Sequence, residues 1–488
     1  MTRGLFFSAG LMFCWPALAA PVASVASVTS IASVTSIASV APDSVSYGRF
    51  GEIHLYQSRG EARDVVLFFS GDDGWNANTG SLAQHLADKG AIVAGIDVPH
   101  YLAQLEKVRD PCVSPSVDLE NLSRYLQAKL KLKFYIQPSV VGYGSGATLA
   151  YAALGQAPEG LFKGALSIGF CPELELKKPL CKGVDIEANA GAASNASQRS
   201  AVLPNKSLPG KWLVLQGEAD RQCTLESTRK FVALGGRGEI VALPKVDQHY
   251  AVDANWLPKF EAAYDRLSAQ PAARNGETAS PVAGLPLIVV RPSAAAIASS
   301  WFAVFLSGDG GWVGLDRGVS HELAAHGIPV VGWDSLKYFW SARTPGGIAQ
   351  DLDRVVRHYS REWGRTHVLL IGYSQGADTM PFMVNRLPAQ TRAMVGLTAL
   401  IGLSDSAVFE FHMSNWLGDA RGGMPTAPEL AHWNGSPYLC IYGEHDRDSA
   451  CDRLTGKGGE AIKMAGGHHF GGGYAQIAEE ILKRLPKL

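Results

Sequence analysis

The sequence predicts an α/β protein made of two tandem copies of one domain, each a mostly parallel sheet flanked by helices. In both halves, apolar runs of strand length alternate with amphipathic stretches of helix length, which is the pattern of a parallel sheet covered on both sides. Four blocks of the first half also return in the second half in the same order. The matched blocks are Phe68–Trp75 with Phe305–Trp312, Ser81–Gly90 with Ser320–Gly327, Val141–Gly146 with Ile371–Gly376, and Leu215–Asp220 with Ile441–Asp446.

Composition divides the chain into five segments. Residues 1–19 carry one basic residue, an apolar run and a small-x-small site, and are expected to be a cleavable signal peptide. Residues 20–45 repeat Val, Ala, Ser and Thr with a period that fits neither helix nor strand, so we expect a low-complexity tether. The first copy then spans 46–267, a linker rich in Ala, Pro and Gly spans 268–286, and the second copy spans 287–488.

Charge and cysteine content narrow the class of protein. The 488 residues have a formal net charge of −1, so there is no basic excess for nucleic acid and no polybasic run for an anionic membrane surface. Of the 7 cysteines, one lies in the expected signal segment, which leaves an even number in the exported chain. An even number without a CxxC or Cys/His cluster favours disulfides over metal ligation. No metal and no organic cofactor is expected.

The remaining cysteines divide between the two copies. Cys440 and Cys451 both lie in the second copy and are expected to pair. The other four, which lie in the first copy, allow three pairings, and Cys171 with Cys181 is the most local choice.

A candidate nucleophile stands at the end of the strand-like run that begins at Val368. The run leads into Gly372-Tyr-Ser374-Gln-Gly376, which is G-x-S-x-G, and a helix-compatible stretch follows. An α/β-hydrolase places its nucleophile on a strained strand-to-helix turn, where small residues two before and two after let strand and helix pass closely. The pattern and its context predict this fold with Ser374 as nucleophile.

Candidates for the acid and the base follow later in the chain, in the order Ser, Asp, His that this fold uses. The acid is expected to be Asp446, which follows an apolar run ending at Tyr442. Asp448 lies close enough to compete, but only Asp446 aligns with an aspartate of the first copy, Asp220.

Either of two adjacent histidines, His468 or His469, can serve as the base. The first copy contains a histidine followed by an aromatic residue at His249, and this shared feature favours His469.

Two backbone N–H groups are expected to hold the oxyanion, those of Gln375 and of Asp309 in the glycine-rich turn Ser307–Gly311. For substrate binding we expect Trp312, as a tryptophan suited to a membrane interface, and Asp378, which lies one helical turn beyond the nucleophile and could bind a cation. The alternatives are core packing for the tryptophan and a structural hydrogen bond beneath the turn for the aspartate.

The first copy differs at the decisive position. Its strand-to-helix turn, the elbow that corresponds to the turn at Ser374, reads Gly142-Tyr-Gly144-Ser145-Gly146. Glycine occupies the nucleophile position, and the serine is displaced by one residue. A shift of one residue on a tight turn redirects the side chain, so the first copy is expected to be inactive and to serve in support, substrate capture or partner binding. The alternative is that Ser145 acts from a re-registered turn.

The two hydrolase-like copies, the expected signal segment and the motifs SGDGGW, GYSQGAD and GGHHF together resemble the VirJ/AcvB family of bacterial periplasmic virulence-associated proteins. The resemblance covers nearly the whole mature chain. It implies a periplasmic serine hydrolase that cleaves the aminoacyl ester of aminoacyl-phosphatidylglycerol, lysyl or alanyl, to give the free amino acid and phosphatidylglycerol. Ser374, Asp446 and His469 would carry the reaction at the periplasmic membrane surface. It also implies partners among type IV secretion components.

Two other functions are compatible with the sequence. The chain could be a non-catalytic periplasmic scaffold or secretion-associated binding protein, which the degenerate first copy favours. It could also be an esterase that acts on another exported ester.

Overall fold

The computed structural model describes residues 43–57, 60–181, 200–235, 237–251, 255–269, 280–293, 299–411, 423–453 and 458–486, which belong to one compact unit. The expected signal segment and most of the expected tether and linker lie outside these residues. The first strand begins at Asp43, so the last residues assigned to the tether belong to the first domain. Within the described ranges, no helix has the length and apolar character needed to cross a bilayer.

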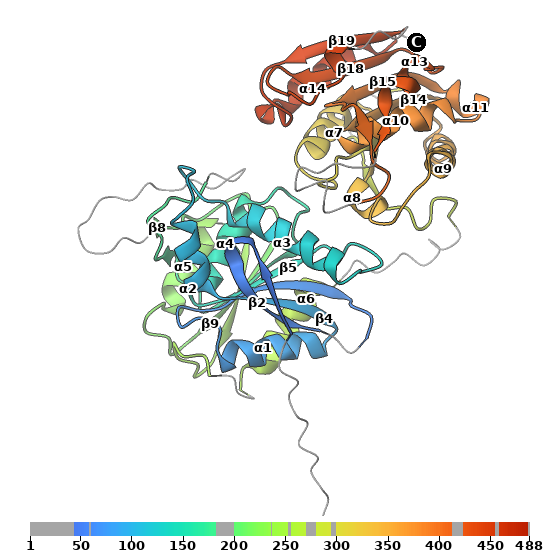
Figure 1. Cartoon of the computed structure of the whole chain (residues 1–488). Coiled ribbons are helices and arrows are strands. Elements are labelled where there is room, and N and C mark those ends of the chain that lie inside the picture. Colours follow the sequence, from blue (N-terminus) through green and yellow to red (C-terminus); the bar gives the residue numbers. More distant parts are fainter. Residues whose placement is uncertain are drawn as a thin grey trace, which may run out of the picture. The chain divides into compact units, whose positions relative to one another are not determined.

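The first domain is built on an eight-stranded sheet with the order β1-β2-β4-β3-β5-β6-β9-β10. In this order, the strands from β4 to the last strand, β10, run parallel to one another. At the other edge, β2 is antiparallel to both of its neighbours, β1 and β4 (Figure 1). Their bounds are β1 Asp43–Tyr47, β2 Gly51–Tyr56, β3 Asp64–Phe69, β4 Ala91–Ile96, β5 Ser139–Tyr143, β6 Gly164–Ile168, β9 Lys211–Gly217 and β10 Gly238–Leu243.

Helices cover both faces of this sheet because its strands are apolar on both sides. Along β3, Leu67 and Phe69 pack into a core with α2, α3, α4 and α5, whereas Val66 and Phe68 pack into a second core with α1 and α6. The bounds are α1 Ala77–Asp88, α2 Val98–Leu105, α3 Pro115–Lys129, α4 Ser145–Gln156, α5 Leu225–Gly235 and α6 Leu257–Ser268, with a 3₁₀ turn at Gly48–Phe50 and a short ribbon of β7 Glu173–Leu174 and β8 Ser200–Ala201.

The second domain repeats this architecture with a seven-stranded sheet of order β11-β13-β12-β14-β15-β18-β19. It is the order of the first sheet without β1. Here only the edge strand β11, which corresponds to β2 of the first sheet, is antiparallel to its neighbour. The tandem duplication predicted from the sequence is therefore present. The bounds are β11 Leu287–Val290, β12 Trp301–Leu306, β13 Val330–Trp333, β14 His367–Tyr373, β15 Val395–Ile401, β18 Tyr438–Gly443 and β19 Gly459–Met464.

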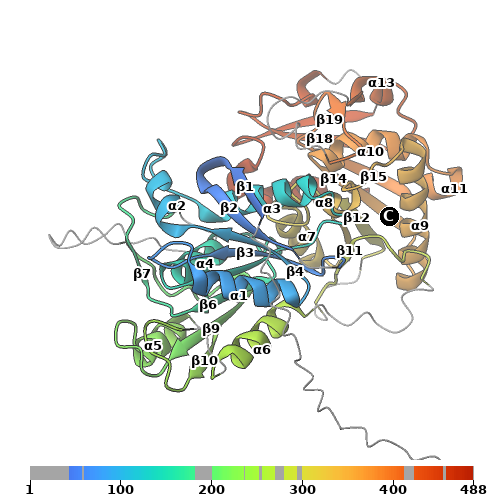
Figure 2. The same cartoon turned by 60° about the horizontal axis from the view of Figure 1, so that its bottom comes forward.

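The helices of the second domain also divide between two faces (Figure 2). One core joins the sheet to α8, α9 and α10, and the other joins it to α7 and α14. The bounds are α7 Leu315–Ala325, α8 Ser335–Tyr338, α9 Pro345–Trp363, α10 Gln375–Asn385, α11 Ala389–Arg392, α13 Thr426–Ala431 and α14 Tyr474–Arg484, with a ribbon of β16 Ser406–Ala407 and β17 Met424–Pro425 and 3₁₀ turns at Cys451–Arg453 and Phe470–Gly472.

A serine repeated in both copies ties each sheet to a helix. The Ser307 hydroxyl donates to the Gly308 carbonyl (3.0 Å) and accepts from the Ser335 N–H (2.9 Å) at the start of α8. In the first domain, the Ser70 hydroxyl accepts in the same way from the Val98 N–H (2.9 Å) at the start of α2. The serine of the repeated S-G-D motif is thus a structural link between the end of one strand and the helix after the next.

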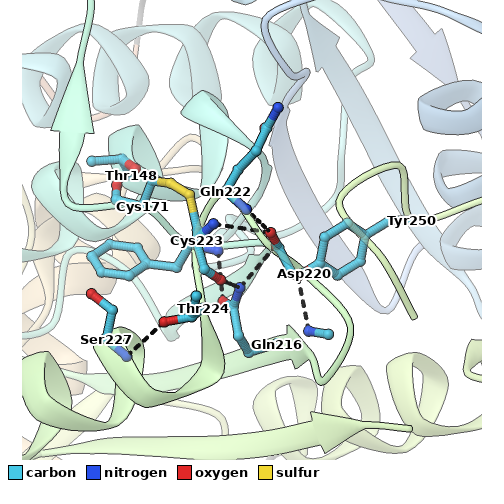
Figure 3. The surroundings of a disulfide bond; sticks show 11 residues. Thr148, Cys171, Gln216, Asp220, Gln222, Cys223, Thr224, Ser227 and Tyr250 are labelled. Carbon is cyan, nitrogen blue, oxygen red and sulfur yellow. Dashed lines mark hydrogen bonds between the residues drawn. A yellow bond between two sulfur atoms is a disulfide. The ribbon is translucent and has the colours of Figure 1, made fainter. Parts of the chain in front are cut away.

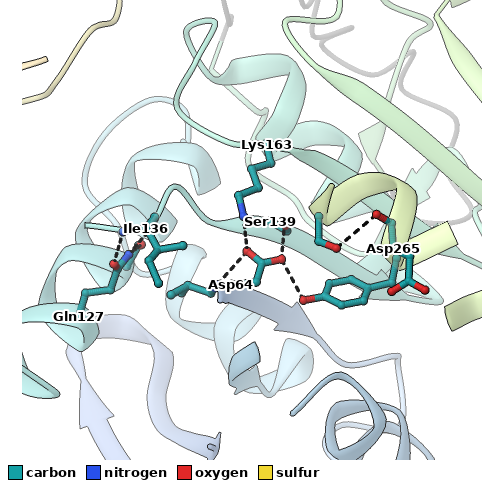
Figure 4. A network of polar contacts seen from close by, with 10 residues as sticks. Asp64, Gln127, Ile136, Ser139, Lys163 and Asp265 are labelled. Carbon is teal, nitrogen blue, oxygen red and sulfur yellow. Dashed lines mark hydrogen bonds and ion pairs between the residues drawn. The ribbon is translucent and has the colours of Figure 1, made fainter. Parts of the chain in front are cut away.

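A buried carboxylate anchors the opposite end of the first sheet. Asp64, 3% exposed at the start of β3, accepts hydrogen bonds from the Lys163 ammonium (2.8 Å), the Tyr264 hydroxyl (2.9 Å) and the Ser139 hydroxyl (3.3 Å), as Figure 4 shows. Because a buried charge is stable only when it is paired and hydrogen-bonded, this network is a structural anchor joining two strands to α6.

Three disulfides cross-link the described residues, and the two in the first domain differ from the most local choice. Cys440 pairs with Cys451 as predicted. Cys171, however, pairs with Cys223 and Cys112 pairs with Cys181, so the predicted Cys171–Cys181 bridge is wrong. The reason lies in the sheet: Cys171 and Cys223 follow the adjacent strands β6 and β9, whose ends meet although they are far apart in sequence.

Candidate active site

The predicted strand-to-helix turn is present at Ser374. This residue lies between β14 and α10 with φ 52° and ψ −120°, a left-handed conformation that residues other than glycine avoid. A Cβ added to Gly372 would lie 2.4 Å from the Gly376 carbonyl oxygen, and one on Gly376 would lie 2.3 Å from that of Leu306. The glycines two before and two after Ser374 are therefore required by the close passage of strand and helix.

Asp446 lies in the loop after β18, the strand that carries Cys440 of the Cys440–Cys451 disulfide. Its carboxylate Oδ2 is 2.8 Å from Nδ1 of His468, and its side chain is 5% exposed. Asp448, the competing acid, is exposed. The structure thus brings together Asp446 and the histidine that the sequence did not favour.

His469 has a different partner. Its Nδ1 is 2.8 Å from the hydroxyl of Tyr373, the residue before the nucleophile. Desolvation lowers the pKa of His469, and the neighbouring His468 lowers it further. The prediction that Asp446 orients His469 is therefore contradicted by the contacts. The comparison with the first copy could not identify the histidine that pairs with the acid, because His249 does not contact Asp220. Its Nε2 lies 3.2 Å from the side-chain amide of Gln248.

The glycine-rich turn lies against the nucleophile. The Gly311 N–H donates to the Gly308 carbonyl (3.0 Å), which places Asp309 and Gly310 at the centre of a tight turn. A Cβ on Gly308 would lie 3.2 Å from the ring of Tyr373 and 3.4 Å from Cβ of Ser374, so the turn packs closely against both residues. On the other side, Gln375 opens α10, where first-turn N–H groups have no partner within the helix.

A cavity of about 1100 Å³ opens at this point. From the second domain it is lined by Ser374, both adjacent histidines, Asp309 and Tyr474, among others. The candidate nucleophile, the aspartate-paired histidine and the glycine-rich turn therefore share one solvent-filled space.

The two residues expected to bind substrate do not line this cavity. Trp312 is 5% exposed and packs edge-on against Phe305, and its ring covers Gly332, where an added Cβ would lie 2.4 Å from a ring atom. Asp378 is 8% exposed and accepts a 2.7 Å hydrogen bond from the Ser404 N–H. Both therefore have the structural roles that were the alternatives: core packing, and a hydrogen bond beneath the turn.

Asp378→Asn tests this structural role. Burial raises the pKa of the Asp378 carboxyl well above its usual value, with the Ser404 N–H opposing the rise. A carboxyl with a raised folded-state pKa contributes stability at low pH that is lost as pH rises through that pKa. We expect the stability of the variant not to decline in this way as pH rises. Its free energy of unfolding at pH 7 should match or exceed that of the wild-type protein. Urea unfolding at pH 4 and pH 7 measures it; a large loss at pH 7 would contradict the assignment.

The first domain preserves the elbow without its chemistry. Gly144 has φ 55° and ψ −122°, nearly the angles of Ser374, so glycine occupies the nucleophile position. Ser145 already belongs to α4 and is 8% exposed, and its hydroxyl has no hydrogen-bond partner within the described residues. The displaced serine thus does not stand at the apex of the turn.

In the first domain, the aspartate that corresponds to Asp446 is Asp220, and its carboxylate accepts structural hydrogen bonds (Figure 3). Asp220 accepts from the Tyr250 hydroxyl and the Gln216 amide, both at 3.1 Å, and from the N–H groups of Gln222 (3.0 Å) and Cys223 (2.9 Å). No histidine contacts it among the described residues. The tyrosine stands where the second copy has Phe470, and both residues have positive φ.

Each domain thus has the fold of the α/β hydrolases, and in the second domain a serine at the strand-to-helix turn and an aspartate-paired histidine line one cavity. The chain belongs to the VirJ family of bacterial virulence proteins, whose model matches residues 63–200 and 300–487. The family resemblance seen in the sequence motifs is thereby confirmed. A comparison with curated proteins finds no match.

The chain is also similar to several solved structures. Est1E from Butyrivibrio proteoclasticus with bound ferulic acid is 11% identical with a TM-score of 0.32, covering 41% of this chain and 95% of that one. An alpha-beta serine hydrolase homologue from Coxiella burnetii is 17% identical with a TM-score of 0.31, covering 41% and 91%. A putative dienelactone hydrolase from Klebsiella pneumoniae is 16% identical with a TM-score of 0.33, covering 47% and 98%.

Proposed function

We propose that this protein is a serine hydrolase that cleaves carboxylic esters with Ser374 as nucleophile, His468 as base and Asp446 as the acid that orients the base. The observation that carries the proposal is the 2.8 Å contact between Asp446 and His468 in the cavity that also holds the strained Ser374. A buried carboxylate on Nδ1 fixes the tautomer in which Nε2 is free to accept a proton.

In this mechanism His468 Nε2 takes the proton of the Ser374 hydroxyl as its oxygen attacks the ester carbonyl. The backbone N–H groups of Asp309 and Gln375 hold the developing oxyanion, and the carboxylate of Asp446 stabilises the imidazolium. The imidazolium then gives its proton to the leaving alkoxide. Water, activated by His468, releases the acid from the acyl-enzyme. No Ser374–His468 hydrogen bond is present in the described residues; such bonds commonly tighten when substrate binds.

For the substrate we propose the aminoacyl ester of aminoacyl-phosphatidylglycerol, lysyl or alanyl, at the periplasmic membrane surface. Membership of the VirJ family supports this choice, and three disulfides fit an oxidising compartment outside the cytoplasm. With Asp378 buried, Asp309 is a second-domain carboxylate of the cavity at Ser374 that suits the cationic amino group. Partners among type IV secretion components stay a prediction from the resemblance.

The test is the release of free amino acid from vesicles that contain lysyl- or alanyl-phosphatidylglycerol. We expect the wild-type protein to release amino acid, Ser374→Ala to lose this activity to background, and Ser145→Ala to keep it, because only Ser374 stands at the apex of an elbow.

If the wild-type protein releases nothing, labelling with a serine-directed fluorophosphonate separates the remaining candidates. Labelling at Ser374 would retain the hydrolase and replace the substrate by another exported ester. No labelling would favour the non-catalytic scaffold, which the glycine at position 144 supports.

A further inference from the structure

The wall of the cavity at Ser374 is completed by the first domain. Residues of α3 and of the segment after α4 line it, among them Glu120, Arg124 and Glu159. Both domains belong to the same compact unit, from residue 42 to the C-terminus. The domain without a nucleophile therefore contributes side chains to the space in front of the nucleophile of the other.

Arg124 makes the most direct of these contributions. It lies on α3, is 2% exposed, and forms an ion pair with Glu120 one helical turn earlier. Its Nη2 also donates a 3.1 Å hydrogen bond to the carbonyl oxygen of Gly310. Gly310 is a central residue of the tight turn that lies against Ser374, so a buried cation of one domain holds the backbone of the glycine-rich turn in the other.

The carboxyl of Glu120 on α3 also interacts with the charge of Asp309 in this turn. Burial raises the pKa of the Glu120 carboxyl, Arg124 opposes the rise, and the carboxylate of Asp309 adds to it. Asp309 precedes Gly310 in the turn and carries one of the N–H groups assigned above to the oxyanion. The Glu120–Arg124 pair therefore meets the turn next to a proposed oxyanion donor.

An oxyanion donor lowers the barrier only if it is held in place before the reaction, and losing one such donor costs about 10²- to 10³-fold in kcat. The turn Gly308–Gly311 contains three glycines, and glycine has the largest conformational freedom of any residue. Ser307 anchors the start of the turn through the Gly308 carbonyl. Arg124 anchors the central peptide from the opposite side.

We propose that Arg124 is a positioning residue for the reaction at Ser374: from the inactive first domain it holds the glycine-rich turn of the active domain in the geometry that the oxyanion requires. This inference rests on the proposed function. It gives the degenerate copy a part in catalysis that needs no nucleophile of its own.

A second contact between the domains supplies a matched control. Trp340 Nε1 donates a 2.7 Å hydrogen bond to the carbonyl oxygen of Leu132, and its ring lies 5.2 Å from that of Tyr135. Like Arg124, Trp340 bonds a backbone carbonyl of the other domain, but it does not line the cavity. Trp340→Phe therefore removes one interdomain hydrogen bond and leaves the turn alone.

The experiment uses the full chain with Arg124→Gln, the double variant Glu120→Gln/Arg124→Gln, and Trp340→Phe. The double variant avoids leaving the Glu120 carboxylate buried and unpaired. kcat and KM on a p-nitrophenyl ester and the rate of fluorophosphonate labelling at Ser374 are measured. We expect both Arg124 variants to lower kcat and the labelling rate by about 10- to 100-fold with KM within about threefold, and Trp340→Phe to keep wild-type values.

The outcomes separate the two proposals. Three results would overturn the role of Arg124: wild-type kcat in the double variant, a change in KM alone, or an equal loss in Trp340→Phe. Labelling of Ser374 in the wild-type protein would still support the hydrolase in each of these cases. Absence of labelling in the wild-type protein would overturn the hydrolase itself, and with it this inference. Thermal unfolding of each variant shows that the measured protein is folded.

Discussion

His468→Ala is expected to lower kcat/KM for ester cleavage by about 10⁴-fold or more, because the variant removes the general base and strands the Asp446 carboxylate without its partner. His469→Ala keeps the 2.8 Å contact between Asp446 and His468 and loses the contact with the Tyr373 hydroxyl together with the ring contacts to Tyr373 and His468. We expect a loss of about tenfold for that variant. The two adjacent histidines are each other's control, since they lie in the same loop.

Steady-state rates on a p-nitrophenyl ester and fluorophosphonate labelling of Ser374 would measure this difference. The pH dependence of kcat/KM adds a second readout: because His468 is retained, His469→Ala should keep the acidic limb of the wild-type profile. If His469→Ala is the more damaged variant, the base is His469, as the comparison of the two copies suggested, and the contact with Asp446 is not catalytic.

Removal of the Cys112–Cys181 disulfide is expected to be the most destabilising change among the cross-links. The bridge joins residues 69 apart, and in the chain-entropy model a loop of this length stabilises by about 4 kcal/mol. The Cys440–Cys451 bridge joins residues 11 apart and stabilises by about 3 kcal/mol in the same model. The double alanine variants of each pair, unfolded in urea, measure the two losses.

The variant with the smaller expected loss of stability, that of Cys440–Cys451, should show the larger loss of activity. The Cys440–Cys451 bridge begins in β18, just before the loop that holds Asp446, whereas Cys112 and Cys181 lie in the first domain. At a temperature where both variants are folded, we therefore expect the larger loss of kcat in the Cys440–Cys451 variant. A larger loss of stability from that variant than from the 69-residue bridge would contradict the entropic account.

The sequence by itself determined the duplicated α/β fold, the elbow at Ser374, the glycine at position 144 and the pairing of Cys440 with Cys451. These features depend on local patterns. Strand and helix periodicities are properties of neighbouring residues, the glycines of G-x-S-x-G act within one turn, and a repeated block needs only comparison of the chain with itself. The bridge between Cys440 and Cys451 is short enough to be local as well.

Only the tertiary structure decided which side chains meet across the sheet. His468 and His469 are adjacent in sequence, and the backbone of one loop turns the first toward Asp446 and the second toward Tyr373. Cys171 pairs with Cys223 because β6 and β9 are neighbouring strands. The spacing of the cysteines in the sequence does not reveal this strand order. Trp312 and Arg124 likewise take their roles from elements distant in sequence. Such contacts depend on the packing of whole elements, which no local pattern encodes.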